Sequence, residues 1–224
     1  MIPKTIHYCW FGRGPMSALN RRCIDSWRRV LPDYDLVAWN EDNADLDSDY
    51  GRATLARGLW SKVANLVRLD VLHRHGGLYF DTDVEVVRRF DELLSLGCFL
   101  GFQQREADVD WVNNAVIGAR PGHPFLAHCL SALHAVHAQT GHIPRGPELF
   151  TSVLRRAGLV RYGRQVLHGV TLMPCESFYP FPWTGRYTPE CVTPDTYCVH
   201  HWEGTWCSPE PASVTSPLPQ GTIE

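Results

Sequence analysis

The sequence predicts an α/β protein built on a mostly parallel sheet with helices on its faces. A segment rich in β-branched and aromatic residues, 5–11, is followed by helical periodicity over 17–30, and the same alternation returns over 36–39 and 59–75. This order of strands and helices is typical of parallel sheets covered by helices. Such sheets bind ligands beyond the carboxyl ends of their strands, so functional residues are expected there.

Length, charge and cysteine content narrow the class of protein. A chain of 224 residues with 44% hydrophobic and 20% charged residues suits one globular domain. The net charge of −3 argues against a general nucleic-acid binder, which needs a basic surface. The eight cysteines are scattered without a CxxC pair and are expected to be free thiols. Neither a leader nor an apolar run of ~18 residues is apparent, so we expect a cytoplasmic protein.

The first two predicted strands frame a helix. The first strand carries Trp10 near its end and runs into the loop 12–15, which contains two glycines and a proline. Apolar residues then recur at helical spacing until Pro32 ends the pattern. The second strand, 36–39, leads into a polar segment, which completes a strand-helix-strand unit.

A second helix is expected over 59–75. Its apolar residues share one face, and Gly76 is placed to cap it. Asn65 and Arg68 are three residues apart and therefore share another face of the same helix.

Two carboxylates follow the next short strand. The glycine pair 76–77 turns the chain into the apolar run 78–80, which leads directly to Asp81 and Asp83. Side chains alternate along an extended chain, so both carboxylates should face one side with Thr82 opposite them.

The later chain repeats the α/β pattern and then becomes irregular. Strands are expected over 98–102 and 114–118, and helices over 124–138 and from about Pro147. Many aromatic residues and prolines over 173–207 indicate a packed irregular cap. We therefore predict one domain, residues 1–207, followed by a flexible Ser/Pro-rich tail, residues 208–224.

Asp81 and Asp83 have the chemistry of a divalent-cation site. Hard oxygen ligands hold such a cation, which can neutralise a diphosphate leaving group. An isolated Asp-x-Asp pattern is also common in solvated turns, so this motif depends on its surroundings.

Several blocks around the motif occur in one order between residue 2 and about residue 206. They are Ile2 to Gly12, Ser26-Trp27, Pro32-Asp33-Tyr34, Arg68 with Gly76 to Asp83, Pro121 to Pro124, Gly146-Pro147, and His200 to Trp206. In these blocks the chain resembles glycosyltransferase family 32, which includes initiating mannosyltransferases and lactosylceramide galactosyltransferases, and also the glucosyltransferase domain of large clostridial toxins. The resemblance implies a single GT-A type domain with a Rossmann-like sheet, a nucleotide-sugar donor, a divalent cation (Mn²⁺ or Mg²⁺) and transfer with retention of anomeric configuration.

The resemblance also implies roles for individual residues. Asp83 would bind the metal directly, and Asp81 would contact the donor ribose or bind the metal through water. Trp10 would stack on the donor base, although an ordinary core position is the alternative. Arg68 would reach the donor sugar or its phosphate, although a helix-surface cation is the alternative.

Further residues of the site come from later blocks. His200 is the first choice as an additional metal ligand and His201 the second, since neighbouring residues of an extended segment face opposite sides. Trp206 would close over the diphosphate or simply pack. Asn113 and Asn114, expected ahead of a strand, would line the acceptor cleft or shape a turn.

These implications predict a hexosyltransferase that uses a UDP-sugar and an acceptor hydroxyl of a glycan, a metabolite or a protein. A GDP-mannose-dependent mannosyltransferase is one alternative. The resemblance also implies that Asn65 binds the donor sugar, at a position where many relatives carry aspartate. Another alternative is therefore a pseudoenzyme that binds the sugar nucleotide without transferring it, because Asn65 lacks that charge. A third alternative is a zinc protein using late cysteines and histidines, Cys191, Cys198, His200, His201 and Cys207, although their spacing fits no common zinc pattern.

Overall fold

The computed structural model describes residues 1–105 and 111–204, and a seven-stranded sheet forms its centre, in the order β2-β1-β3-β6-β5-β8-β7. The strands are β1 (Thr5–Cys9), β2 (Asp35–Trp39), β3 (Gly77–Phe80), β5 (Cys98–Phe102), β6 (Val112–Ala119), β7 (Gln165–Leu167) and β8 (Val170–Met173). Strands β2, β1, β3, β5 and β8 run in one direction, whereas β6 and β7 run antiparallel to their neighbours. The sheet is therefore mixed and mostly parallel, which confirms the predicted fold class.

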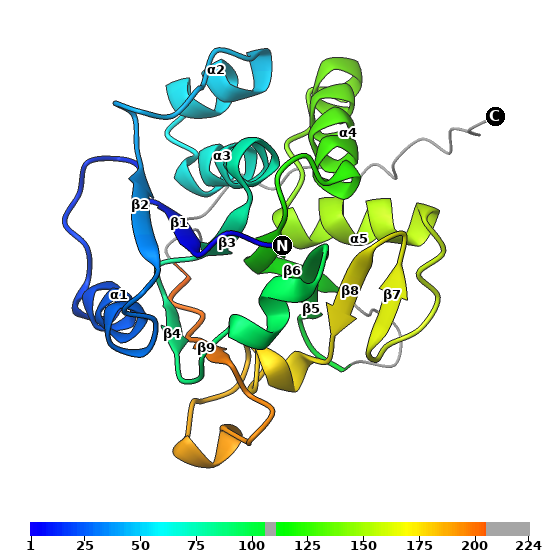
Figure 1. Cartoon of the computed structure of the whole chain (residues 1–224). Helices are drawn as coiled ribbons and strands as arrows, with labels where there is room; N and C mark the ends of the chain where they lie inside the picture. Colours follow the sequence, from blue (N-terminus) through cyan, green and yellow to red (C-terminus); the bar gives the residue numbers. More distant parts are fainter. Residues whose placement is uncertain (106–110, 205–224) are drawn as a thin grey trace.

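Helices cover the sheet in two groups. Figure 1 shows α2, α3 and α4 together on one side, whereas α1 lies beside a small second sheet, β4-β9. The helices are α1 (Ala18–Val30), α2 (Asp49–Ala56), α3 (Trp60–His75), α4 (Pro124–Thr140) and α5 (Gly146–Arg156). The strands of the small sheet are β4 (Val84–Val86) and β9 (Cys198–His200). Short 3₁₀ helices occupy Asp91–Ser95, Cys175–Ser177 and Pro189–Cys191.

Helix α1 begins at a capping box and docks through one tryptophan. The Ser17 hydroxyl accepts a hydrogen bond from the Asn20 amide, while the Asn20 side chain accepts one from the Ser17 amide. Trp27 is fully buried, packs edge-on against Phe80 and donates from Nε1 to the Val84 carbonyl at 2.6 Å. This contact fixes α1 against β4, directly after the Asp-x-Asp motif.

Several expectations need correction at the level of elements. Helix α2 and the short strands β7, β8 and β9 were not predicted, although the strand over 98–102 and the helix beginning near Pro147 are confirmed. Strand β6 begins at Val112, so the expectation that Asn113 and Asn114 lie ahead of a strand was wrong: both are inside it. The predicted tail, 208–224, lies outside the described residues.

His7 joins β1 to the end of α3 in its neutral form. Its Nε2 lies 2.9 Å from the Gly76 carbonyl, and its Nδ1 accepts a hydrogen bond from Trp39 Nε1 at 3.1 Å. These two contacts require a proton on Nε2 and none on Nδ1. Burial lowers the pKa of His7 to about 4, so the buried ring resists protonation.

This histidine should make stability depend on pH. Between its ordinary pKa of 6.5 and the folded value of about 4, the unfolded chain holds more protons on His7 than the native protein does. The free energy of unfolding should therefore fall as the pH decreases through this window, by roughly 3 kcal/mol in total. Urea unfolding of the wild type and of His7→Gln at pH 7 and pH 5 measures the effect as a difference between the two proteins. Parallel pH profiles would contradict it.

Candidate active site

The Asp81-Thr82-Asp83 motif forms a turn between β3 and β4. The Asp81 amide donates to the Ala115 carbonyl at 2.9 Å, and the Val84 amide donates back to the Asp81 carbonyl at 3.0 Å. The expectation of an extended, alternating chain through the motif was therefore wrong, because this hydrogen bond closes a turn. The carboxylates of Asp81 and Asp83 nevertheless lie close together in this turn.

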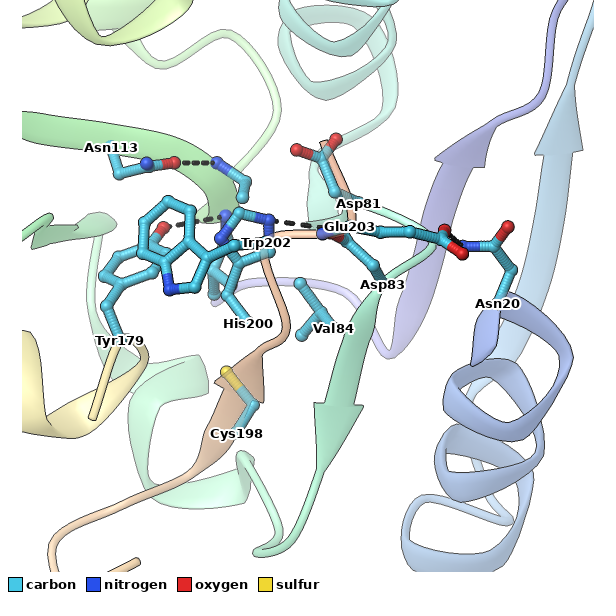
Figure 2. A network of polar contacts seen from close by, with 12 residues as sticks. Asn20, Asp81, Asp83, Val84, Asn113, Tyr179, Cys198, His200, Trp202 and Glu203 are labelled. Carbon is cyan, nitrogen blue, oxygen red and sulfur yellow. Dashed lines mark hydrogen bonds and ion pairs between the residues drawn. The ribbon is translucent and has the colours of Figure 1, made fainter. Parts of the chain in front are cut away.

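Asp81, Asp83 and His200 form a cluster suited to a divalent cation. One ligand atom from each residue lies within 4.8 Å of the others. Strand β9 brings His200 there, since Val84 pairs with His200 in the β4-β9 register. Figure 2 shows the Asp83 and His200 side chains beside each other, with Asp81 close by. Two carboxylates and one imidazole are a donor set that fits Mn²⁺ or Mg²⁺, with space left for substrate oxygens.

Asp83 and His200 stabilise each other's charged form. His200 Nε2 lies 3.2 Å from Asp83 Oδ1, and the Glu203 amide donates to Asp83 Oδ2 at 2.9 Å. Burial opposes ionisation of Asp83, but the histidine and the amide outweigh burial and lower the pKa of Asp83 to about 2. Burial likewise favours neutral His200, but Asp83 outweighs it and raises the pKa of that ring. At neutral pH Asp83 is therefore an anion, as a metal ligand must be.

Arg68 is a buried cation that fixes Asp81. Its side chain lies against the Tyr79 ring, 4.4 Å from the centroid, and its Nη2 is 3.0 Å from Asp81 Oδ1. The Tyr79 hydroxyl donates to the same oxygen at 3.1 Å, and Arg68 Nη1 donates to the Asn114 carbonyl at 2.5 Å. Arg68 is only 4% exposed, so these contacts occupy much of its guanidinium. The geometry makes Arg68 the residue that orients Asp81.

The asparagines of the site make two separate contacts. Asn114 Nδ2 donates to Asn65 Oδ1 at 2.9 Å, which links β6 to α3 beside Arg68. A Cβ atom at Gly146 would lie 2.1 Å from Asn114 Nδ2, so glycine is needed at the start of α5. Asn113 instead donates to Gln103 at 2.9 Å, because neighbouring residues of a strand face opposite sides.

Two tryptophans lie close to the ends of elements near the site: Trp10 directly follows β1, and Trp60 is the first residue of α3. Trp10 is partly buried, and its Nε1 donates to the Gly14 carbonyl at 2.7 Å. Trp60, which the sequence reasoning missed, is 42% exposed, and a Cβ atom at Gly12 would lie 2.7 Å from its Nε1. The spacing of Trp60 along α3 places it on the same face as the buried Val67. The sequence therefore held no signal that set it apart from the core residues of the helix.

Two family models match the chain, and each covers part of this site. Residues 17–100, which contain the motif, match the "Glycosyltransferase sugar-binding region containing DXD motif". Residues 118–217 match the "Alpha 1,4-glycosyltransferase conserved region". Both halves of the chain are thus similar to family models of glycosyltransferases.

Relatives of the chain carry names that refer to different sugars. Lactosylceramide 4-alpha-galactosyltransferase of Mus musculus is 34% identical over 154 residues, which is 62% of this chain and 40% of the relative. Inositol phosphoceramide mannosyltransferase 3 of Schizosaccharomyces pombe is 29% identical over 133 residues, which is 56% of this chain and 35% of the relative. The matches thus span less than half the length of these two relatives.

Solved structures agree with the predicted GT-A architecture. The PaToxG glycosyltransferase superposes with a TM-score of 0.56 at 20% identity, covering 69% of each chain. The galactosyltransferase LgtC, solved with donor and acceptor sugar analogues, gives a TM-score of 0.51 at 14% identity and covers 92% of this chain and 87% of its own. The chain therefore has the GT-A fold.

Other predicted site residues lie apart from the cation cluster or outside the described residues. His201 Nε2 contacts Glu85 at 2.8 Å, so His201 is not in the cluster. Trp206 lies outside the described residues. The seven described cysteines are free thiols, and within residues 1–105 and 111–204 no cysteine belongs to a candidate metal group. No helix in these ranges combines the length and hydropathy that crossing a bilayer requires.

Proposed function

We propose that this chain is a metal-dependent, retaining hexosyltransferase. It takes a hexose from a nucleoside-diphosphate sugar, with a UDP-sugar as the first choice, and transfers it to a hydroxyl of a glycan, a metabolite or a protein. The observation that carries the proposal is the convergence of Asp81, Asp83 and His200 beyond the end of β3. A cytoplasmic location stays a prediction from the sequence.

The residues of the cation cluster would stabilise the nucleoside diphosphate that leaves the donor. Asp81, Asp83 and His200 would hold Mn²⁺ or Mg²⁺, which supplies positive charge opposite the departing diphosphate. Arg68 holds Asp81 in its orientation, and the Glu203 amide, which donates to Asp83 Oδ2, favours the ionised form of Asp83. Retention would then follow from attack by the acceptor hydroxyl on the same face of the sugar, through an oxocarbenium-like transition state. We assign no residue as a covalent nucleophile.

The base of the donor is proposed to bind between the β1-α1 loop and the start of α3. Trp10 and Trp60 offer aromatic surface there, and aromatic stacking tolerates any base. A UDP-sugar and GDP-mannose are therefore both candidates, the second because a named relative is a mannosyltransferase. Thermal-shift measurements with UDP-galactose, UDP-glucose and GDP-mannose, each with and without Mn²⁺, distinguish them, because a bound donor stabilises the native state.

A sugar-nucleotide-binding pseudoenzyme is the second candidate function. Asn65 is neutral and its Oδ1 is engaged by Asn114, so no carboxylate stands at this position of α3. Release of free nucleoside diphosphate from the donor that binds, in the presence of Mn²⁺, would support the transferase and exclude the pseudoenzyme. Tight donor binding without any release or transfer would support the pseudoenzyme.

Trp10 provides a direct test of the donor site. Trp10→Ala removes the stacking surface and is expected to raise the KM for the donor by about tenfold to a hundredfold, since stacking on one base contributes ~1–3 kcal/mol. Trp10→Phe keeps a ring and should change the KM much less. Steady-state kinetics with the donor varied at saturating acceptor measure both variants. An unchanged donor KM in Trp10→Ala would show that the base binds elsewhere.

A further inference from the structure

The segment 201–204 turns sharply after β9 and passes beside the cation cluster. Trp202 has a left-handed backbone, with φ of 55°, which is uncommon for a residue other than glycine. Its ring lies against His200, with centroids 4.1 Å apart, and its Nε1 donates to the Phe181 carbonyl at 3.0 Å. The next residue, Glu203, is thereby brought to Asp83.

Glu203 connects Asp83 to helix α1. Its amide donates to Asp83 Oδ2 at 2.9 Å, while His200 occupies the other oxygen, Oδ1. Its carboxylate accepts a hydrogen bond from Asn20 Nδ2 at 2.7 Å. Figure 2 shows Asn20 on α1 facing Glu203, with Asp83 beside Glu203. Both oxygens of Asp83 are therefore held, one of them by a segment that Asn20 anchors.

The orientation of the Asn20 amide is fixed from the other end. Asn20 is 1% exposed, and its Oδ1 accepts a hydrogen bond from the Ser17 amide at 3.2 Å in the capping box. Because the oxygen faces Ser17, the NH₂ group must face Glu203. Asn20 therefore contacts both the capping box at the start of α1 and the segment 201–204 beside the cation cluster.

We infer that Asn20 is a positioning residue for the cation cluster, acting through Glu203 on Asp83. The inference rests on the proposed function, because it assigns Asn20 to the support of a Mn²⁺ site. Residues that orient metal ligands typically change metal affinity by about tenfold to a hundredfold when they are replaced. Asn20 donates the one side-chain hydrogen bond described here that ties Glu203 to α1.

The Asn20→Asp variant separates geometry from charge. The new carboxylate can still accept from Ser17 but opposes the carboxylate of Glu203, so the segment should move away from α1. An added negative charge near the cluster would by itself favour Mn²⁺, whereas loss of positioning weakens its binding. We expect the Kd for Mn²⁺ to rise about tenfold, measured by the electron paramagnetic resonance signal of free Mn²⁺. The sign of the change therefore decides between the two effects.

A double variant and a control complete the experiment. Asn20→Asp combined with Glu203→Gln restores a hydrogen bond with donor and acceptor exchanged, at the wild-type net charge, and should return the Kd to near the wild-type value. Ser17→Ala removes the hydroxyl from the capping box and should lower the Tm without changing the Kd.

Asp83→Ala separates failure of this inference from failure of the proposed function. If Asp83→Ala loses Mn²⁺ binding while folded Asn20→Asp binds Mn²⁺ as well as the wild type does, only the role of Asn20 is overturned. If Asp83→Ala binds Mn²⁺ unchanged, the cation site is overturned as well. An unrescued double variant would also contradict the positioning role, because hydrogen bonding and charge are then both restored without effect.

Discussion

The Asp83→Ala variant is expected to lose transfer activity by about a thousandfold or more, equivalent to ~4 kcal/mol of transition-state stabilisation. The negative charge of Asp83 is favoured, since burial is outweighed by His200 and by the Glu203 amide. Its removal takes away a ligand and leaves the buried His200 ring without its partner. Product formation across a Mn²⁺ titration measures the loss.

The matched control for this prediction is Thr82→Ala in the same turn. Thr82 is not a member of the cation cluster, and its replacement should leave activity within about threefold of the wild type. Circular dichroism at the assay temperature must show that Asp83→Ala is folded, because breaking a buried ion pair destabilises proteins by ~3–5 kcal/mol. Full activity of Asp83→Ala in metal-free buffer would contradict the metal-dependent function.

Arg68→Ala is expected to have the largest effect on stability. It removes a 4%-exposed cation that contacts Asp81, the Tyr79 ring and the Asn114 carbonyl. Loss of one partner of a buried pair costs ~3–5 kcal/mol, so the variant should be severely destabilised. Urea unfolding measures this cost, with Arg74→Ala as the control. Arg74 lies on the same helix with a side chain 51% exposed, and its ion pairs should contribute at most ~1 kcal/mol each.

Arg68→Lys separates orientation from charge. Lysine keeps the positive charge but lacks the planar group that reaches Asp81 and the Asn114 carbonyl together. We expect this variant to be folded, with activity lowered by about a hundredfold because Asp81 is no longer held in place. Wild-type activity in Arg68→Lys would show that Arg68 is only a structural counter-charge.

The sequence predicted the elements that surround the motif, because their patterns are long or sharply bounded. Helix α3 follows from its apolar spacing and from Gly76, and β5 from an apolar run that was expected at its observed bounds, 98–102. Strands β7 and β9, each of three residues, are too short to show a period. The aromatic composition around β9 therefore led to the prediction of an irregular cap. The strand that places His200 was not predicted.

The contacts of the site could be predicted only in part. Asp81, Asp83 and His200 come together as a cluster, but the turn at Thr82 depends on the Asp81 to Val84 hydrogen bond rather than on alternation. The distinction between His200 and His201 required the β4-β9 register. Pairing between distant segments leaves no local trace in a single sequence, so the contact between Asn20 and Glu203 had no signal either.

The β4-β9 pairing completes the cation cluster with a segment near the end of the described chain. Asp83 and Glu203 are 120 positions apart, so a nascent chain presents both aspartates long before His200 and the segment beside it emerge. Closing so long a loop has an entropic cost that local structure does not offset. Mn²⁺, if it binds the completed cluster as proposed, would favour the state in which β9 is paired with β4 by mass action.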